Sequence, residues 1–135
     1  MKKIFTLLSI AFIAALSIGT ASCSSKESKL LGKWNLVKEG YNSRGMMDVD
    51  GTYWEFLEGN TVIVEENGVK DYGTWKLITD VGALKRDYLV IDMDSRKDLS
   101  ERYYVSQLAE KAGSDASPRL TLVIEDEQYL FSFTK

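Results

Sequence analysis

The sequence predicts an all-β domain: a small antiparallel, mostly up-and-down barrel of eight strands. Three observations lead to this fold class. After residue 30, no segment repeats its apolar residues with the period of about 3.6 that marks an amphipathic helix. Short runs rich in Val, Ile, Tyr, Trp, Phe and Thr recur instead, separated by turn residues. Each run has one apolar face and one mixed face, as antiparallel strands closing around a single core require.

The predicted strands follow one another as Leu31–Lys38, Thr52–Leu57, Thr61–Glu66, Val69–Ile78, Asp87–Asp94, Arg102–Leu108, Leu120–Glu125 and Gln128–Thr134. Alternation is clear in the second strand, where Trp54 and Phe56 share one face. Asn67-Gly68 predicts a two-residue hairpin between the third and fourth strands, because both residues tolerate positive φ. Closing the sheet removes exposed edges, and eight strands leave room inside for side chains or one small ligand.

The N-terminus predicts a secretory signal. Met1-Lys2-Lys3 is basic, Ile4–Ile18 is apolar except for three hydroxyl residues, and small residues precede Cys23. The apolar run is shorter than the roughly 20 residues that a transmembrane helix needs. We therefore expect residues 1–22 to be a removed signal peptide rather than a permanent span.

Thr20-Ala21-Ser22-Cys23 resembles a lipobox, the cleavage site of bacterial lipoprotein precursors, with Thr20 where most lipoboxes have Leu. The resemblance implies that Cys23 begins the mature chain and carries acyl groups such as palmitate, which would anchor the protein stably. We expect residues 23–29 to be a polar tether and residues 30–135 the domain. The alternative is an ordinary secreted protein with a cysteine near its cleavage site.

The anchor would place the domain in the cell envelope, on the outer membrane. Only Glu27 is acidic in the stretch after the cysteine. Some bacterial lipoproteins carry an acidic export signal there, so we expect the periplasmic side rather than the cell surface.

Composition excludes several classes of function. The predicted mature chain loses Lys2 and Lys3 and no acid, so 15 Lys and Arg stand against 20 Asp and Glu, a formal charge of −5. An acidic domain is a poor nucleic-acid binder. Without histidine, and with its one cysteine expected to be acylated, the chain lacks the usual catalytic triads and zinc ligand sets. We expect no cofactor and no enzymatic activity.

Two Gly-x-Trp segments resemble those of lipocalins and of small bacterial lipocalin-like lipoproteins: Gly32-Lys33-Trp34 and Gly73-Thr74-Trp75. With the eight strands, they cover most of residues 30–134. The resemblance implies a binding barrel with an apolar cavity, in which Trp34 packs across the closed end and both motifs are structural. Another small antiparallel barrel or sandwich is the alternative.

The long connection Glu39–Gly51 contains the predicted binding loop, Tyr41–Asp50, since in lipocalins the connection after the first strand lies over the open end. Our candidate ligand contacts are Tyr41, Arg44, Met46, Met47 and, on the next strand, Trp54. Methionines suit an adaptable apolar surface, and an arginine can pair with an anionic head group. Alternatively, the methionines only cap the barrel and the tryptophans only fill its core.

The acidic segments do not predict a metal site or catalysis. Asp48-Val49-Asp50-Gly51 begins like a calcium loop, but the further oxygen ligands and distal Glu do not follow in register. Asp92 and Asp94 fit a solvated strand face, and Glu125-Asp126-Glu127 fits a charged turn. Neither group shows the buried acid that glycoside hydrolysis requires.

Two functional hypotheses follow. In the first, the lipid-anchored barrel binds a small apolar or amphipathic molecule, gated by the loop around residues 41–50. In the second, the barrel has no cavity and acts as an interaction or inhibitor module for another envelope protein. A cavity of roughly 300 Å³ or more favours the first, and an interior filled by aromatic side chains favours the second.

Overall fold

The computed structural model describes residues 25–109 and 117–135. The predicted signal peptide and Cys23 lie outside these ranges. The described elements are α2 (Ser25–Leu30), β1 (Gly32–Tyr41), β2 (Gly45–Asp48), β3 (Thr52–Leu57), β4 (Thr61–Glu66), β5 (Val69–Val81), β6 (Arg86–Met93), β7 (Arg102–Ala109), β8 (Arg119–Ile124) and β9 (Tyr129–Thr134). No helix in the described part of the chain is long and apolar enough to cross a membrane.

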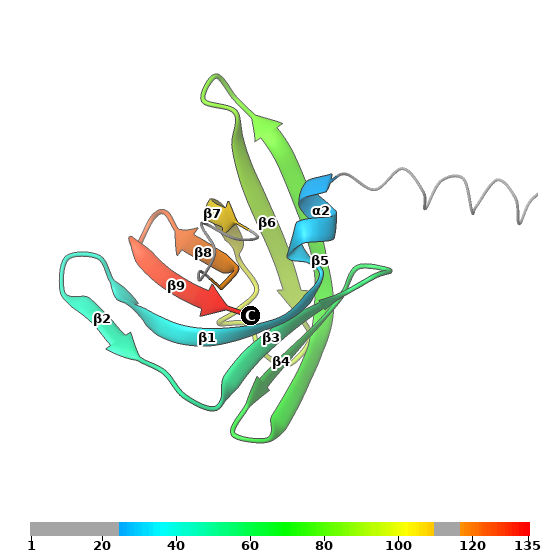
Figure 1. Cartoon of the computed structure of the whole chain (residues 1–135), viewed down its shortest axis with the longest axis vertical. Helices are drawn as coiled ribbons and strands as arrows, with labels where there is room; N and C mark the ends of the chain where they lie inside the picture. Colours follow the sequence, from blue (N-terminus) through cyan, green and yellow to red (C-terminus); the bar gives the residue numbers. More distant parts are fainter. Residues whose placement is uncertain (1–24, 110–116) are drawn as a thin grey trace, which may run out of the picture.

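All nine strands belong to one antiparallel sheet in the order β2-β1-β3-β4-β5-β6-β7-β8-β9, and β1 also pairs with β9. That last pairing closes β1 and β3 to β9 into an eight-stranded barrel, with β2 outside it as a short partner of β1 (Figure 1). The predicted fold class is confirmed. Asn67 and Gly68 have φ values of 52° and 86°, so the predicted hairpin turn between β4 and β5 is confirmed too.

Strand β1 closes the barrel because its two halves have different neighbours. Gly32–Asn35 pair with β3, and Asn35–Tyr41 pair with β9. The last four residues of β1 also pair with β2 on the opposite edge. We call the end of the barrel where β1 begins the closed end, and the end where β1 finishes the mouth.

The interior is filled mainly by alternate residues of the barrel strands. The buried strand residues of this core are Trp34, Leu36, Trp54, Phe56, Val62, Val64, Trp75, Leu77, Leu89, Ile91, Met93, Tyr103, Leu120, Leu122, Phe131 and Phe133. Burying a side chain of this size contributes about 1.5–3 kcal/mol relative to leaving it exposed. One continuous apolar core therefore holds the closed sheet together.

Helix α2 covers the closed end. Leu30 is fully buried, and its carbonyl oxygen accepts a hydrogen bond of 2.7 Å from Trp34 Nε1. Lys26 Nζ lies 3.1 Å from Asp87 Oδ2 on β6. The helix occupies residues 25–29 of the stretch expected to be a polar tether, and Lys26 ties it to β6. A six-residue helix is unstable alone, so tertiary contacts decide its formation.

The two Gly-x-Trp tryptophans occupy core positions at the closed end. Trp75 is 4% exposed, and its Nε1 donates a hydrogen bond of 3.1 Å to the carbonyl oxygen of Leu57. A Cβ at Gly73 would collide with the carbonyl oxygen of Asp92. Glycine at this position therefore lets β5 and β6 approach closely beside the tryptophan.

Candidate functional site

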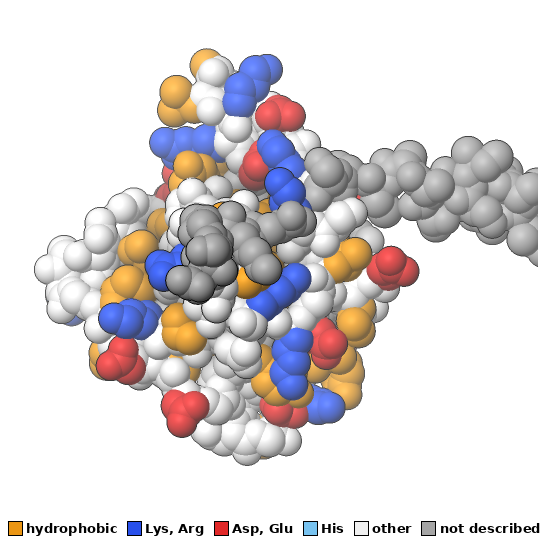
Figure 2. All heavy atoms as spheres, in the orientation of Figure 1, with side chains coloured by type: hydrophobic (Ala, Val, Ile, Leu, Met, Phe, Trp, Pro, Cys, Tyr) orange, Lys and Arg blue, Asp and Glu red, His pale blue; other side chains and the backbone are white. Residues whose placement is uncertain are grey.

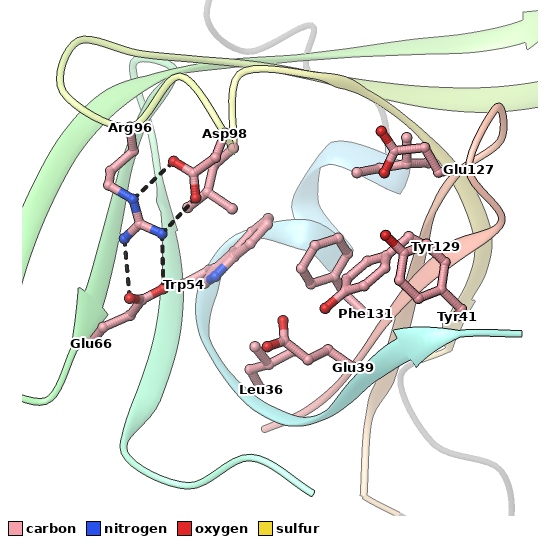
Figure 3. Close-up of a pocket in the computed structure, with 12 residues that line it drawn as sticks. Leu36, Glu39, Tyr41, Trp54, Glu66, Arg96, Asp98, Glu127, Tyr129 and Phe131 are labelled. Atoms are coloured by element: carbon pink, nitrogen blue, oxygen red, sulfur yellow. Dashed lines mark hydrogen bonds and ion pairs between the residues drawn. The ribbon is translucent and has the colours of Figure 1, made fainter. Parts of the chain in front are cut away.

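The mouth contains a pocket of about 410 Å³ (Figure 3). Its lining comes from β1, β3, β4, β8 and β9 and from the loops that follow β6 and β8. The lining residues are Leu36, Glu39, Tyr41, Trp54, Glu66, Arg96, Asp98, Leu99, Ile124, Glu127, Tyr129 and Phe131. Apolar residues lie toward the core, while charged and tyrosine side chains surround the entrance.

A bulge in β1 brings two of these side chains into the pocket. Leu36 pairs with Phe133 of β9, and Lys38 pairs with the adjacent Ser132. Val37 is therefore an extra residue in the ladder. An extra residue reverses which alternate positions face inward. Trp34 and Leu36 face the core before the bulge, and Glu39 and Tyr41 line the pocket after it.

Arg96, in the loop between β6 and β7, is held at the mouth by carboxylates from three elements. Its Nε and Nη2 donate to Asp98 at 3.0 and 2.9 Å, and Nη1 and Nη2 lie 3.1 and 3.2 Å from the two oxygens of Glu66. Asp71 on β5 is 3.8 Å away. The hydrogen bonds raise the pKa of Arg96 and lower that of Asp98. This network fastens the loop to β4 and β5.

An aromatic wall lines the opposite side of the pocket. The ring centroids of Tyr41 and Tyr129 are 4.9 Å apart, those of Tyr129 and Phe131 are 5.1 Å apart, and those of Phe131 and Trp54 are 5.4 Å apart. Each contact is tilted or edge-on, a favourable geometry for aromatic pairs. Figure 3 shows Tyr41, Tyr129 and Phe131 across the pocket from the Arg96 network, with Trp54 between the two groups.

The entrance is electrostatically negative. Burial and the nearby Glu66 carboxylate raise the pKa of Glu39, while a hydrogen bond with Tyr129 opposes that shift. Burial and Glu39 together raise the pKa of the Tyr129 hydroxyl. Arg96 is already bonded to Glu66 and Asp98. Glu39 and Glu127 therefore supply carboxylate charge to the pocket that the Arg96 network does not neutralise.

Below the pocket the barrel is filled. Trp54 contacts Tyr103, Phe131 and Phe133 at centroid distances of 5.0–5.8 Å. Leu99 of the β6–β7 loop is 7% exposed, and its carbonyl oxygen accepts a hydrogen bond of 2.7 Å from the buried Tyr103 hydroxyl. The space available to a ligand is therefore at the mouth rather than deep in the barrel.

The structure places only some of the predicted ligand-contacting residues in the pocket. Tyr41 and Trp54 line the pocket. Arg44 lies outside the lining, with its guanidinium carbon 5.6 Å from the Tyr41 ring centroid. Met46 and Met47 are on β2, and Met47 is 66% exposed. The expected gating loop is instead a β1–β2 hairpin, because its backbone pairs with the outer edge of β1.

Sequence reasoning missed the charged lining residues Glu39, Glu66, Arg96, Asp98 and Glu127. One of them carried a usable signal: Glu66 continues the alternation of Val62 and Val64, so period two places it on the inner face at the strand end. Glu39 is inward only because of the bulge, and Arg96 reaches the site from a loop. Within residues 25–109 and 117–135, no three His, Cys, Asp or Glu side chains are arranged to hold a metal.

Comparison with known proteins supports the fold. No protein-family model matches the chain, and no curated protein matches it significantly. A lipocalin-like protein from Bacteroides uniformis ATCC 8492 is similar in structure, with a TM-score of 0.55 and 19% identity over 79% of this chain and 98% of that one. An uncharacterized protein from Bacteroides eggerthii DSM 20697 gives a TM-score of 0.54 and 17% identity over 78% and 98%. The described domain is a lipocalin-like barrel.

Proposed function

We propose that this protein is a lipid-anchored binding protein whose mouth pocket holds one small amphipathic molecule. The observation that carries the proposal is the pocket of about 410 Å³ at the open end of a lipocalin-like barrel. Pockets for small ligands commonly measure about 300–1,000 Å³. The volume suits one small molecule, or the head group of a larger one.

The lining favours a ligand with an apolar body and a positively charged head. Phe131 and Trp54 offer an apolar floor, and the Tyr129 ring above them can attract a cation, whereas the Tyr41 ring already has the Arg44 guanidinium over it. Glu39 and Glu127 would add direct charge pairing, since the only cation among the described lining residues, Arg96, is bonded to two carboxylates. An anionic head group would meet these acids without a free basic partner in the pocket.

The anchor is the second part of the proposal. Cys23 is the only cysteine in the chain, follows small residues after an apolar run, and precedes the first described helix by two residues. Acylation there would fix the barrel to the outer membrane, on its periplasmic side. The intact mass of protein extracted from the native membrane tests this part: diacylglyceryl and acyl additions on Cys23 support it, and an unmodified cysteine refutes it.

Isothermal titration with two probes of equal chain length tests the pocket. We expect decyltrimethylammonium to bind below its micelle concentration and decanoate to bind much more weakly. Glu39→Gln should weaken binding of the cation, because it removes a pocket charge and preserves size. Met47→Ala, outside the lining, should leave it unchanged. Equal binding of both probes, or equal behaviour of both variants, would contradict the assignment.

The filled interior favours a second candidate, an interaction module for another envelope protein. A native mass spectrum of gently extracted protein separates the two. A discrete extra mass of small-molecule size, lost on mild activation, supports the binding barrel. A stoichiometric protein partner without a small adduct supports the interaction module.

A further inference from the structure

The β5–β6 hairpin projects beyond the closed end of the barrel (Figure 1). Its strands remain paired as far as Val81 and Arg86. Apolar side chains are exposed around its tip: Leu84 is 73% exposed and Val81 36%, with Lys85 beside them. Figure 2 shows apolar and basic side chains together on this projection. Leu84 has the most exposed large apolar side chain of the described residues, and its place on a projecting tip makes it a candidate interaction site.

The same hairpin holds the start of α2. Lys26 Nζ lies 3.1 Å from Asp87 Oδ2 on β6 and 3.7 Å from Asp80 Oδ1 on β5. Ser25 therefore begins the helix beside the base of the projecting tip. Cys23 is two residues earlier, and two residues span at most about 7 Å. Any lipid on Cys23 would thus enter its bilayer close to this hairpin.

We propose that the tip of the β5–β6 hairpin rests in the membrane surface beside the Cys23 anchor, with the mouth of the barrel facing away from the bilayer. This inference rests on the proposed acylation of Cys23. Leu84 and Val81 would enter the interfacial region, where their burial is favourable. Lys85 would reach the lipid phosphates, since lysine extends its charge toward the head groups while its stem lies on apolar surface.

The orientation has a consequence for the binding site. Strand β1 runs from the closed end beneath α2 to the mouth, where Glu39 and Tyr41 line the pocket. A barrel standing on its closed end opens its pocket toward the aqueous phase. The barrel would therefore exchange ligand with a soluble partner, or with a partner that faces its mouth. It would not take the ligand directly from the membrane to which it is anchored.

The test uses the lipidated full chain in vesicles of phosphatidylethanolamine and phosphatidylglycerol. Because Cys23 is acylated, Leu84→Cys and Asn67→Cys each introduce a single free thiol for an environment-sensitive nitrobenzoxadiazole label. Position 84 is at the tip, and position 67 is in the β4–β5 turn at the mouth. We expect a blue shift at position 84 and loss of its emission when lipids spin-labelled near the head group are included. We expect neither at position 67.

Equal responses at the two positions would overturn the orientation while leaving the anchor and pocket intact. A concentration-dependent blue shift at position 84 without quenching by the labelled lipids would assign the tip to a second copy of the chain instead. An intact mass without acyl groups would overturn the anchor and this inference together. Leu84→Ser on the lipidated chain is the second variant: a label at Lys85→Cys should then lose part of its quenching, whereas unchanged quenching argues against insertion of the tip.

Discussion

Leu99 links the β6–β7 loop to the core, and its truncation tests whether that loop closes the floor of the pocket. The side chain is 7% exposed and belongs to the core cluster. Replacing a buried leucine by alanine costs about 2–5 kcal/mol. We expect about 2–3 kcal/mol for Leu99→Ala, because the vacated space adjoins a pocket that water can enter. For a domain of this size, the melting temperature should fall by roughly 8–12 °C.

Urea denaturation followed by tryptophan fluorescence, together with thermal melts, measures the effect. Leu84→Ala is the matched control, since Leu84 is 73% exposed at the hairpin tip and its truncation should change stability by no more than about 0.5 kcal/mol. If both variants lose the same stability, Leu99 does not pack into the core and the described floor of the pocket is wrong.

Three further predictions follow from the mouth and the barrel wall. Arg96→Met should lower the free energy of unfolding by about 1–2 kcal/mol, because partly buried carboxylates lose their shared cation. The loss, measured by urea unfolding, should shrink at high salt. A loss that does not depend on salt would contradict this reasoning. The pKa of Glu39 is raised in the folded protein, so its contribution to stability falls as pH rises through that pKa. At pH 7, Glu39→Gln should therefore have a higher melting temperature than the parent protein, and below pH 4.5 the two melting temperatures should be equal. A difference that stays constant across that range would refute the raised pKa of Glu39. Gly73→Ala should lower the free energy of unfolding by about 1–3 kcal/mol, because the added methyl group overpacks against Asp92. An unchanged melting temperature would show that β6 moves to accommodate the methyl group.

Much of the barrel was predictable because strand alternation is a local property. Trp54 and Phe56, or Phe131 and Phe133, face the core because they are two residues apart on a half-buried strand. The Asn67-Gly68 turn was predictable for the same reason, since the two residues alone favour its backbone angles. The sequence predicts a loop at residues 45–48, because four residues with two methionines show no clear alternation. Pairing with β1 makes the segment a strand.

The candidate site was predictable only where it continues such a pattern. The predicted loop position of Tyr41 is not what brings it to the pocket. Tyr41 lines the pocket because of the bulge at Val37, which no local pattern reveals. Arg96 gave no signal in the sequence, because its partner Glu66 is 30 residues away along the chain. Met46 and Met47 are predicted contacts on residue type alone, and both lie outside the lining.

The sequence by itself determined the positions of the eight barrel strands, which of their faces are apolar, and the class of fold that they close into, but not the short strand β2. Tertiary structure alone decided that Ser25–Leu30 is a helix, that β1 changes its inward face, and that charged groups surround the mouth. The physical reason is the range of the interactions. Alternation and turn preference act between neighbours, whereas helix docking, bulges and ion networks depend on residues that only the closed barrel brings together.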